Sequence, residues 1–172
     1  MSRSRVVISL VAVLVAIVIQ TTVFGSGGIQ PLGIAPALVT LVVIAVSTHI
    51  ESEYLLLIGF TGGTLMDLMG SGTLGLWAMT LTVVAYVAGR LKHRFVDGPW
   101  VIVGVVVGLT ALGQFLFVLL ATLFGHGTIA QPGLFSKILL PGVWNLILAV
   151  PVFWFLGRAF ESRQRGVGVR RA

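Results

Sequence analysis

The chain has 172 residues, of which 57% are hydrophobic and only 9% are charged, and its mean hydropathy is +1.08. This composition excludes an ordinary water-soluble domain and indicates an integral membrane protein. The formal charge of +6 does not indicate nucleic-acid binding, because the basic residues gather at the ends of apolar segments. The chain has no cysteine, which excludes disulfides, thiolate metal sites and a cysteine nucleophile.

Six apolar runs follow one another along the chain, separated by short clusters of turn-forming or charged residues. A helix needs about 20 residues to cross a bilayer, so each run is interpreted as one span. The sequence therefore predicts an all-α integral membrane protein with six transmembrane helices in one domain, residues 1–157, and a basic, disordered cytoplasmic tail, residues 158–172. The predicted spans are residues 6–24, 32–48, 54–69, 73–89, 99–124 and 134–156.

The distribution of basic residues predicts the orientation of these helices. If the first residues are cytoplasmic, every lysine and arginine except Lys137 falls in a cytoplasmic segment. Cytoplasmic segments of membrane proteins are enriched in lysine and arginine. Both termini are therefore predicted to be cytoplasmic.

Asp67 is a lone charge in the apolar tract 54–89, which is too long for one span and must turn at Gly70 and Gly72. An ionisable side chain inside a span costs at least ~2.5 kcal/mol and needs a partner. One interpretation is that Asp67 caps the exposed amides at the start of the fourth helix, at residue 72 or 73. The other is an ion pair with Lys137, in the first turn of the last span. The sequence leaves both open.

Other polar and glycine residues have weaker signals. Gln20, near the outer end of the first helix, is a further candidate partner for Asp67. Asn145, inside the last span, is expected to form hydrogen bonds between helices rather than to bind a ligand. Gly59 and Gly63, four residues apart, offer a face on which another helix can pack closely.

The patterns of common enzymes are incomplete. His49, Glu51 and Glu53 form H-x-E-x-E, not the H-E-x-x-H of zinc proteases, and are expected to cap the start of the third helix. Asp67 and Asp97 fall on opposite sides of the predicted membrane, which excludes an aspartyl dyad. The sequence therefore predicts no enzymatic activity, no cofactor and no metal.

One stretch resembles a known family. Residues 59–94, GFTGGTLMDLMGSGTLGLWAMTLTVVAYVAGRLKHR, resemble the central signature of the rod shape-determining protein MreD family. In that signature a glycine-rich helix leads to D-L-x-x-x-x-x-x-G, here Asp67 to Gly75, and then to a helix with a basic cytoplasmic end. The stretch IQTTVF (19–24) is similar to the glutamine-containing end of the family's first helix, and APALVTLVVIAV (35–46) to its proline-bearing second helix. The HIESEY loop is more acidic than the family's loop, and the second half carries no diagnostic motif.

The resemblance implies a non-enzymatic scaffold subunit of the bacterial elongation (rod) complex in the cytoplasmic membrane. Such a subunit binds MreC, helps to organise MreB filaments and supports RodA-type enzymes in lateral peptidoglycan synthesis, in contact with membrane lipids and not with nucleic acid. Family members also resemble the six-helix substrate-binding subunits of energy-coupling-factor transporters. The alternative is thus a subunit for vitamin-like molecules, with Asp67, Lys137 and Asn145 lining a pocket. Because outer polar residues are few, the sequence favours the scaffold.

Overall fold

The computed structural model describes residues 3–25, 28–30, 33–70, 73–96, 98–125 and 133–168, and these residues form helices and no strands. Within them, three helical segments are long and apolar enough to cross a membrane: Arg5–Thr22, Trp100–Leu123 and Leu134–Glu161. The helices are α1 (Arg3–Thr22), α2 (Leu38–Ser47), α3 (Ser52–Met69), α4 (Leu76–Leu91), the 3₁₀-helix η2 (Lys92–Val96), α5 (Pro99–Leu123) and α6 (Leu134–Gly168).

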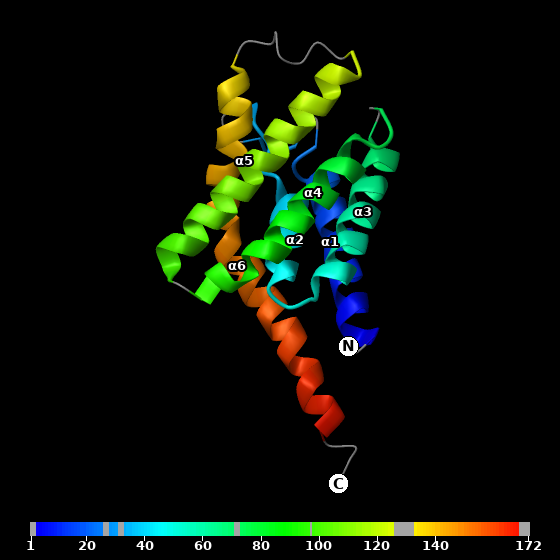
Figure 1. Ribbon diagram of the computed structural model, residues 1–172, viewed down its shortest axis with the longest axis vertical. Coiled ribbons are helices and arrows are strands. Elements are labelled where there is room, and N and C mark those ends of the chain that lie inside the picture. The colour runs from blue at the N-terminus through cyan, green and yellow to red at the C-terminus, as the bar shows by residue number, and fades with distance from the viewer. Residues whose placement is uncertain are drawn as a thin grey trace.

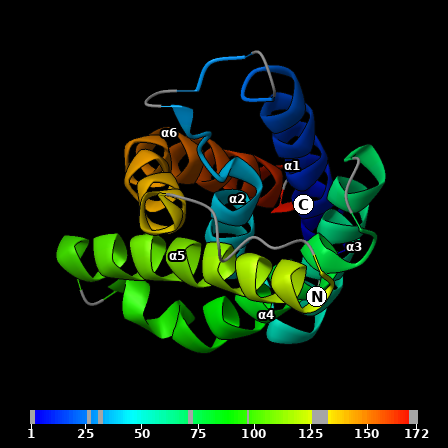
Figure 2. The same cartoon turned by 90° about the horizontal axis from the view of Figure 1, so that it is seen from above.

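Helix α2 forms the centre of the molecule (Figure 1). All of its residues are buried, and it packs against α1, α3, α4, α5 and α6. Seen from above, the other helices surround it (Figure 2). A helix that is apolar on every face is typical of such a fully enclosed position.

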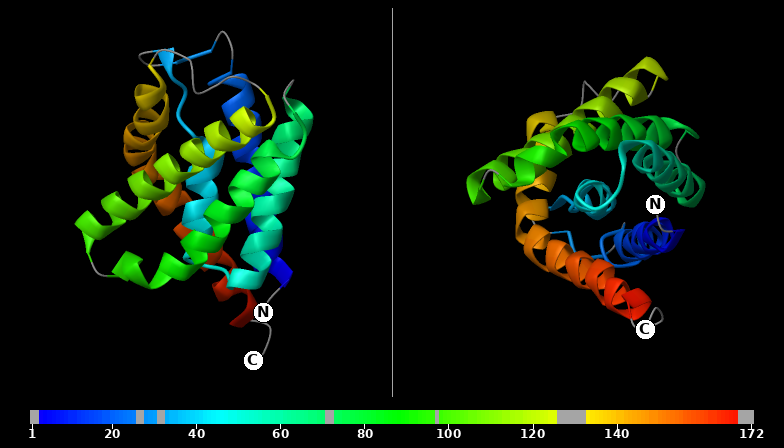
Figure 3. Two further views of the ribbon diagram at one scale, coloured as in Figure 1. Left: turned by 45° about the horizontal axis from the view of Figure 1, so that its top comes forward. Right: turned by 60° about the horizontal axis from the view of Figure 1, so that its bottom comes forward.

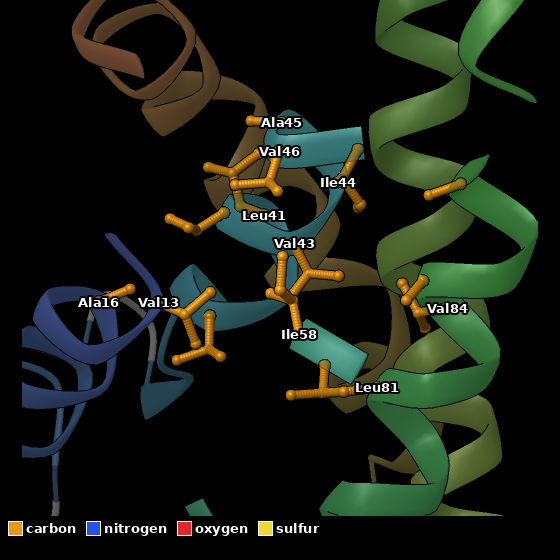
Figure 4. Close-up of a cluster of buried hydrophobic side chains, with 14 of the residues drawn as sticks. Val13, Ala16, Leu41, Val43, Ile44, Ala45, Val46, Ile58, Leu81 and Val84 are labelled. Atoms are coloured by element: carbon orange, nitrogen blue, oxygen red, sulfur yellow. The ribbon is translucent and has the colours of Figure 1, made fainter. Parts of the chain in front are cut away.

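The core consists of aliphatic side chains around α2 (Figure 4). Residues from α1, α3 and α4 point toward this helix from different sides. In a bilayer the lipid tails are as apolar as these side chains, so the helices associate through close packing rather than through exclusion of water. The side chains labelled in the figure are Val13, Ala16, Leu41, Val43, Ile44, Ala45, Val46, Ile58, Leu81 and Val84.

The predicted second span, residues 32–48, is wrong in about its first third. Residues 34–37 are not helical, and α2 begins only at Leu38. The cause is local, since Gly33 has a positive φ of 74° and Pro36 disfavours helical geometry in the residue before it. With 10 residues, α2 is about 15 Å long, half of a hydrocarbon core of about 30 Å. Non-helical backbone therefore leads into the central helix.

Helices α3 and α4 form the predicted hairpin and lie side by side (Figure 3). The observed bounds agree with the predicted spans 54–69 and 73–89 except at the turn, where α4 starts three residues later than expected. The start of α1, the helix η2 and the end of α6 lie at one end of the bundle, opposite to this turn (Figure 1).

The prediction of a disordered tail is also corrected. The last helix does not stop at residue 156 but continues to Gly168, so residues 158–168 are helical, and residues 169–172 lie outside the described part. The extension is anchored by packing: Phe160 is buried, and the guanidinium of Arg158 lies 4.4 Å from the ring centroid of Trp154. Such contacts, together with residues of good helix propensity, favour continuation of the helix.

Candidate functional site

The carboxylate of Asp67 caps the start of α4. Its Oδ2 accepts hydrogen bonds from the backbone N–H groups of Gly75 at 2.9 Å and Ala78 at 3.1 Å, and its Oδ1 accepts one from Trp77 at 3.0 Å. Asp67 is only 6% exposed. The first N–H groups of a helix have no partner within it, and a negative charge is favourable at that end. Asp67 therefore satisfies α4 from a neighbouring helix.

The sequence positions Asp67 through two glycines on the same face of α3. Gly59, Gly63 and Asp67 are four residues apart, so they line one side of the helix. A Cβ atom on Gly59 would stand 2.7 Å from the Cβ atom of Ala85, and one on Gly63 would stand 2.6 Å from the backbone nitrogen of Ala78. The lack of side chains lets α3 approach α4 closely. The carboxylate thereby reaches the first turn of α4.

The turn glycines have different roles. Gly75 is the N-cap residue of α4 and has a φ of 99°, a left-handed conformation that favours glycine. Gly70 ends α3, and its N–H donates to the carbonyl of Met66 at 3.0 Å. Gly72 lies outside the described residues. The structure shows this cap, and the amides that donate to Asp67 include those of Gly75, Trp77 and Ala78, at the start of α4, which begins later than expected.

The structure does not bring Lys137 to Asp67. Lys137 is exposed in the first turn of α6, whereas Asp67 lies in the last turn of α3. These two helix ends lie on opposite sides of the bundle in both views (Figures 1 and 2). Of the two interpretations of Asp67, the geometry agrees with the cap.

Gln20, which the sequence made a candidate partner for Asp67, caps the start of α2. Its Oε1 accepts a hydrogen bond from the N–H of Val39 at 2.9 Å, in the first turn of α2. The N-cap residue of α2, Ala37, has no side chain able to do this. Gln20 therefore binds an N–H group at the start of the central helix rather than the carboxylate of Asp67.

Asn145 binds a carbonyl group at the same start of α2. Its Nδ2 donates to the carbonyl of Ala37 at 2.9 Å and to Oγ1 of Thr110 at 3.1 Å, and the side chain is fully buried. This joins α6, α5 and the start of α2, as the predicted interhelical role requires. Its Oδ1 is buried and has no hydrogen-bond partner among the described residues.

His49 does not cap α3 as expected. Its ring stacks on that of Phe160 in α6, with 4.4 Å between centroids and 9° between planes, and its Nδ1 lies 2.7 Å from Oγ1 of Thr48. Burial lowers the pKa of His49 from its ordinary value of 6.5; the guanidinium of Arg5 also lowers it, while the carbonyl of Ala45 and Glu161 raise it. Of the expected caps, Glu53 lies in the first turn of α3.

Sequence reasoning missed two contacts that hold these elements in place. The ring of Trp77 stacks on that of Phe117, with 4.4 Å between centroids, and so joins the capped end of α4 to α5. The stack of His49 on Phe160 joins the α2–α3 loop to α6. Aromatic residues are frequent in membrane helices, so no spacing in the sequence identified either pair.

The chain matches a family of known proteins. Residues 2–159 match the family described as rod shape-determining protein MreD. No curated protein and no solved structure matches the chain. The likeness to energy-coupling-factor subunits therefore stays a prediction.

Proposed function

The chain belongs to the rod shape-determining protein MreD family, and from this premise we propose that it is a non-enzymatic scaffold of the bacterial elongation complex. In this proposal it crosses the cytoplasmic membrane six times, binds MreC, and supports MreB filaments and RodA-type enzymes in lateral peptidoglycan synthesis. The family match supports the role in cell shape. The partners, the number of spans and the location are the proposed part.

The observation that carries the proposal is the use of three polar side chains inside the bundle, of which Asp67 and Asn145 are buried and Gln20 is half-buried. Asp67, Gln20 and Asn145 all bind backbone groups of this chain. A carrier of a small polar molecule needs polar groups that converge on a pocket and are available to the ligand. Here Asp67 and Asn145, two of the three residues that the transporter alternative would use, bind the starts of α4 and α2 instead. That alternative therefore receives no support from the site.

The arrangement of charges supports the proposed orientation. The start of α1, the helix η2 and the end of α6 lie at one end of the bundle (Figure 1) and carry basic residues such as Arg5, Lys92 and Arg158. Lys137 lies at the first turn of α6, toward the other end. Positive charge gathers on the cytoplasmic side of membrane proteins. The basic end is accordingly cytoplasmic in this proposal.

We place a partner helix on the face of α5 that points away from the bundle. The pair Gly59 and Gly63 is already packed against α4, so it is not available to another protein. By contrast, Gly104 and Gly108 of α5 are exposed and have nothing within 4 Å of an added Cβ atom. Small residues four positions apart allow close contact between membrane helices. We propose that a transmembrane helix of the partner MreC packs on this face.

Co-purification from the native membrane tests this function. Tagged wild-type protein is expected to recover MreC, and the variant with Gly104→Leu and Gly108→Leu is expected to recover at least tenfold less. Gly157→Leu is the matched control, because Gly157 in α6 is also open and should keep its partner. Recovery of an ATPase module instead of MreC by the wild type would contradict the scaffold. Equal recovery by all variants would contradict the α5 face.

A further inference from the structure

An apolar groove runs between α1 and α6, with α2 as its floor. Its volume is about 670 Å³, and its lining consists of valine, isoleucine, leucine, alanine, proline and phenylalanine side chains. On α1 it extends from Val7 to Ile19, and on α6 from Pro151 to Ala159. No polar group in this lining can bind a polar ligand. The groove therefore suits a hydrocarbon chain.

The length of the groove distinguishes between possible occupants. From Val7 to Ile19, α1 rises about 18 Å, compared with about 30 Å for the whole hydrocarbon core. A transmembrane helix of another protein would need a surface along the whole core. The groove covers little more than one leaflet, which matches one acyl chain of a lipid.

A polar pocket of about 330 Å³ lies at the basic end of the bundle. It contains the cations Arg5 from α1 and Lys92 from η2, the carboxylate of Glu51, and the imidazoles of His49 and His93. Two cations and one carboxylate leave one net positive charge. Since burial lowers the pKa of His49 below 6.5, that imidazole is neutral at pH 7 and adds no charge. The pocket complements a monoanionic group.

The pocket adjoins the groove along α1, and its His49 contacts α6 where the groove ends. On α1, Arg5 of the pocket lies one helical turn or less from Val7 and Ile8 of the groove. On α6, Ala159 of the groove precedes Phe160, whose ring is covered by His49 of the pocket. A molecule with an anionic head and an apolar tail can thus occupy both at once.

We propose that the groove and the pocket together bind an anionic phospholipid, with one acyl chain between α1 and α6 and the phosphate beside Arg5 and Lys92. The basic pocket lies at the proposed cytoplasmic end of the helices, where such pockets bind lipid headgroups. The proposal rests on the membrane orientation given above and not on any protein partner. The lipid would fill the apolar groove between α1 and α6.

Native mass spectrometry of the purified, delipidated full chain tests the headgroup. Phosphatidylglycerol is expected to bind at least fivefold more tightly than phosphatidylcholine. Lys92→Gln should weaken phosphatidylglycerol binding about fivefold, the equivalent of ~1 kcal/mol for one cation at the surface. Arg90→Gln is the matched control, because Arg90 loses the same charge at the same end but contacts Tyr86 outside the pocket. Equal affinity for both lipids, or an equal loss in Arg90→Gln, would overturn the headgroup assignment.

A second pair of variants tests the acyl chain. Val11 lines the groove and is 56% exposed, so Val11→Trp fills the groove with little change to the core. Val18, 45% exposed on the same helix and outside the lining, provides the control Val18→Trp. Only Val11→Trp should lower lipid binding. Displacement of the lipid by inorganic phosphate, or no effect of Val11→Trp, would show a free-anion site and overturn the proposal. These measurements need no MreC, so their failure is distinguishable from failure of the scaffold.

Discussion

Gly63 of α3 faces Ala78 of α4 so closely that a Cβ atom on Gly63 would overlap the Cα atom of Ala78. The obstacle is backbone, which cannot turn away as a flexible side chain can. This contact sets the separation of the two helices immediately beside the Asp67 cap. The closeness of the hairpin and the cap are therefore parts of one arrangement.

Replacing Gly63 should separate the hairpin. We expect Gly63→Val to lower the free energy of unfolding by about 3 kcal/mol, which is the upper end of the usual range for overpacking a core. The melting temperature in detergent measures this, with Gly104→Val as the control, because Gly104 has nothing within 4 Å of an added Cβ atom. Equal melting temperatures of the two variants would contradict the close approach.

Removing the carboxylate of Asp67 should destabilise the start of α4. We expect Asp67→Ala to cost about 2 kcal/mol, as for loss of a helix cap with a charged acceptor. The amides of Gly75, Trp77 and Ala78 should then exchange their hydrogens faster, which hydrogen exchange measures directly.

A double-mutant cycle separates this cap from an ion pair. Because Lys137 lies away from Asp67, the coupling of Asp67→Ala with Lys137→Ala should stay within about 0.5 kcal/mol. A larger coupling would favour the ion pair that the sequence also allowed.

Much of this architecture was predictable because it rests on local chemistry. Apolar runs bounded by turn residues identified α1, α3, α5 and the start of α6 to within a few residues. The spacing of Gly59 and Gly63 predicted a face for close helix packing, and in the structure that face lies against α4. Hydropathy and helical spacing depend only on residues close in the sequence, so these features could be predicted without knowledge of the tertiary structure.

The features that escaped prediction depend on residues far apart in the sequence. Hydropathy treats residues 32–48 as one span, yet Gly33 and Pro36 interrupt it, and Gln20 and Asn145 satisfy the backbone there. No pattern within the sequence indicates that a glutamine and an asparagine so far apart meet at one helix end. The sequence indicates how deep a residue lies in the membrane, but not how the helices are ordered around α2. For this reason the contact of Gln20 with α2 was missed, and Lys137 was considered as a partner for Asp67.

The broken start of α2 should depend on Asn145. Replacing it with leucine, which has a similar volume, removes one of the two donors to the carbonyl of Ala37, which keeps the N–H of Leu41 at 3.0 Å, and also removes the bond to Thr110. We expect a loss of about 1 kcal/mol, the net contribution of a typical hydrogen bond. Thr110→Val is the milder control, because Asn145 then keeps its bond to Ala37. A larger drop in melting temperature for Thr110→Val than for Asn145→Leu would contradict this assignment.

The stability of the protein should fall in mild acid through His49. Its folded pKa is lowered below 6.5 mainly by burial, so above pH 6.5 the imidazole is neutral in both states and its stack on Phe160 contributes fully. As the pH falls below 6.5, the unfolded chain binds a proton that the folded chain resists, and this favours unfolding until the pH passes the folded pKa. Comparison of melting temperatures at about pH 7.5 and about pH 5 measures the effect. His49→Phe keeps an aromatic ring against Phe160 without a titrating group, so it should lose less stability over the same interval. If both proteins lose the same amount, the acid sensitivity arises elsewhere, and the burial of the His49 ring against α6 does not control it.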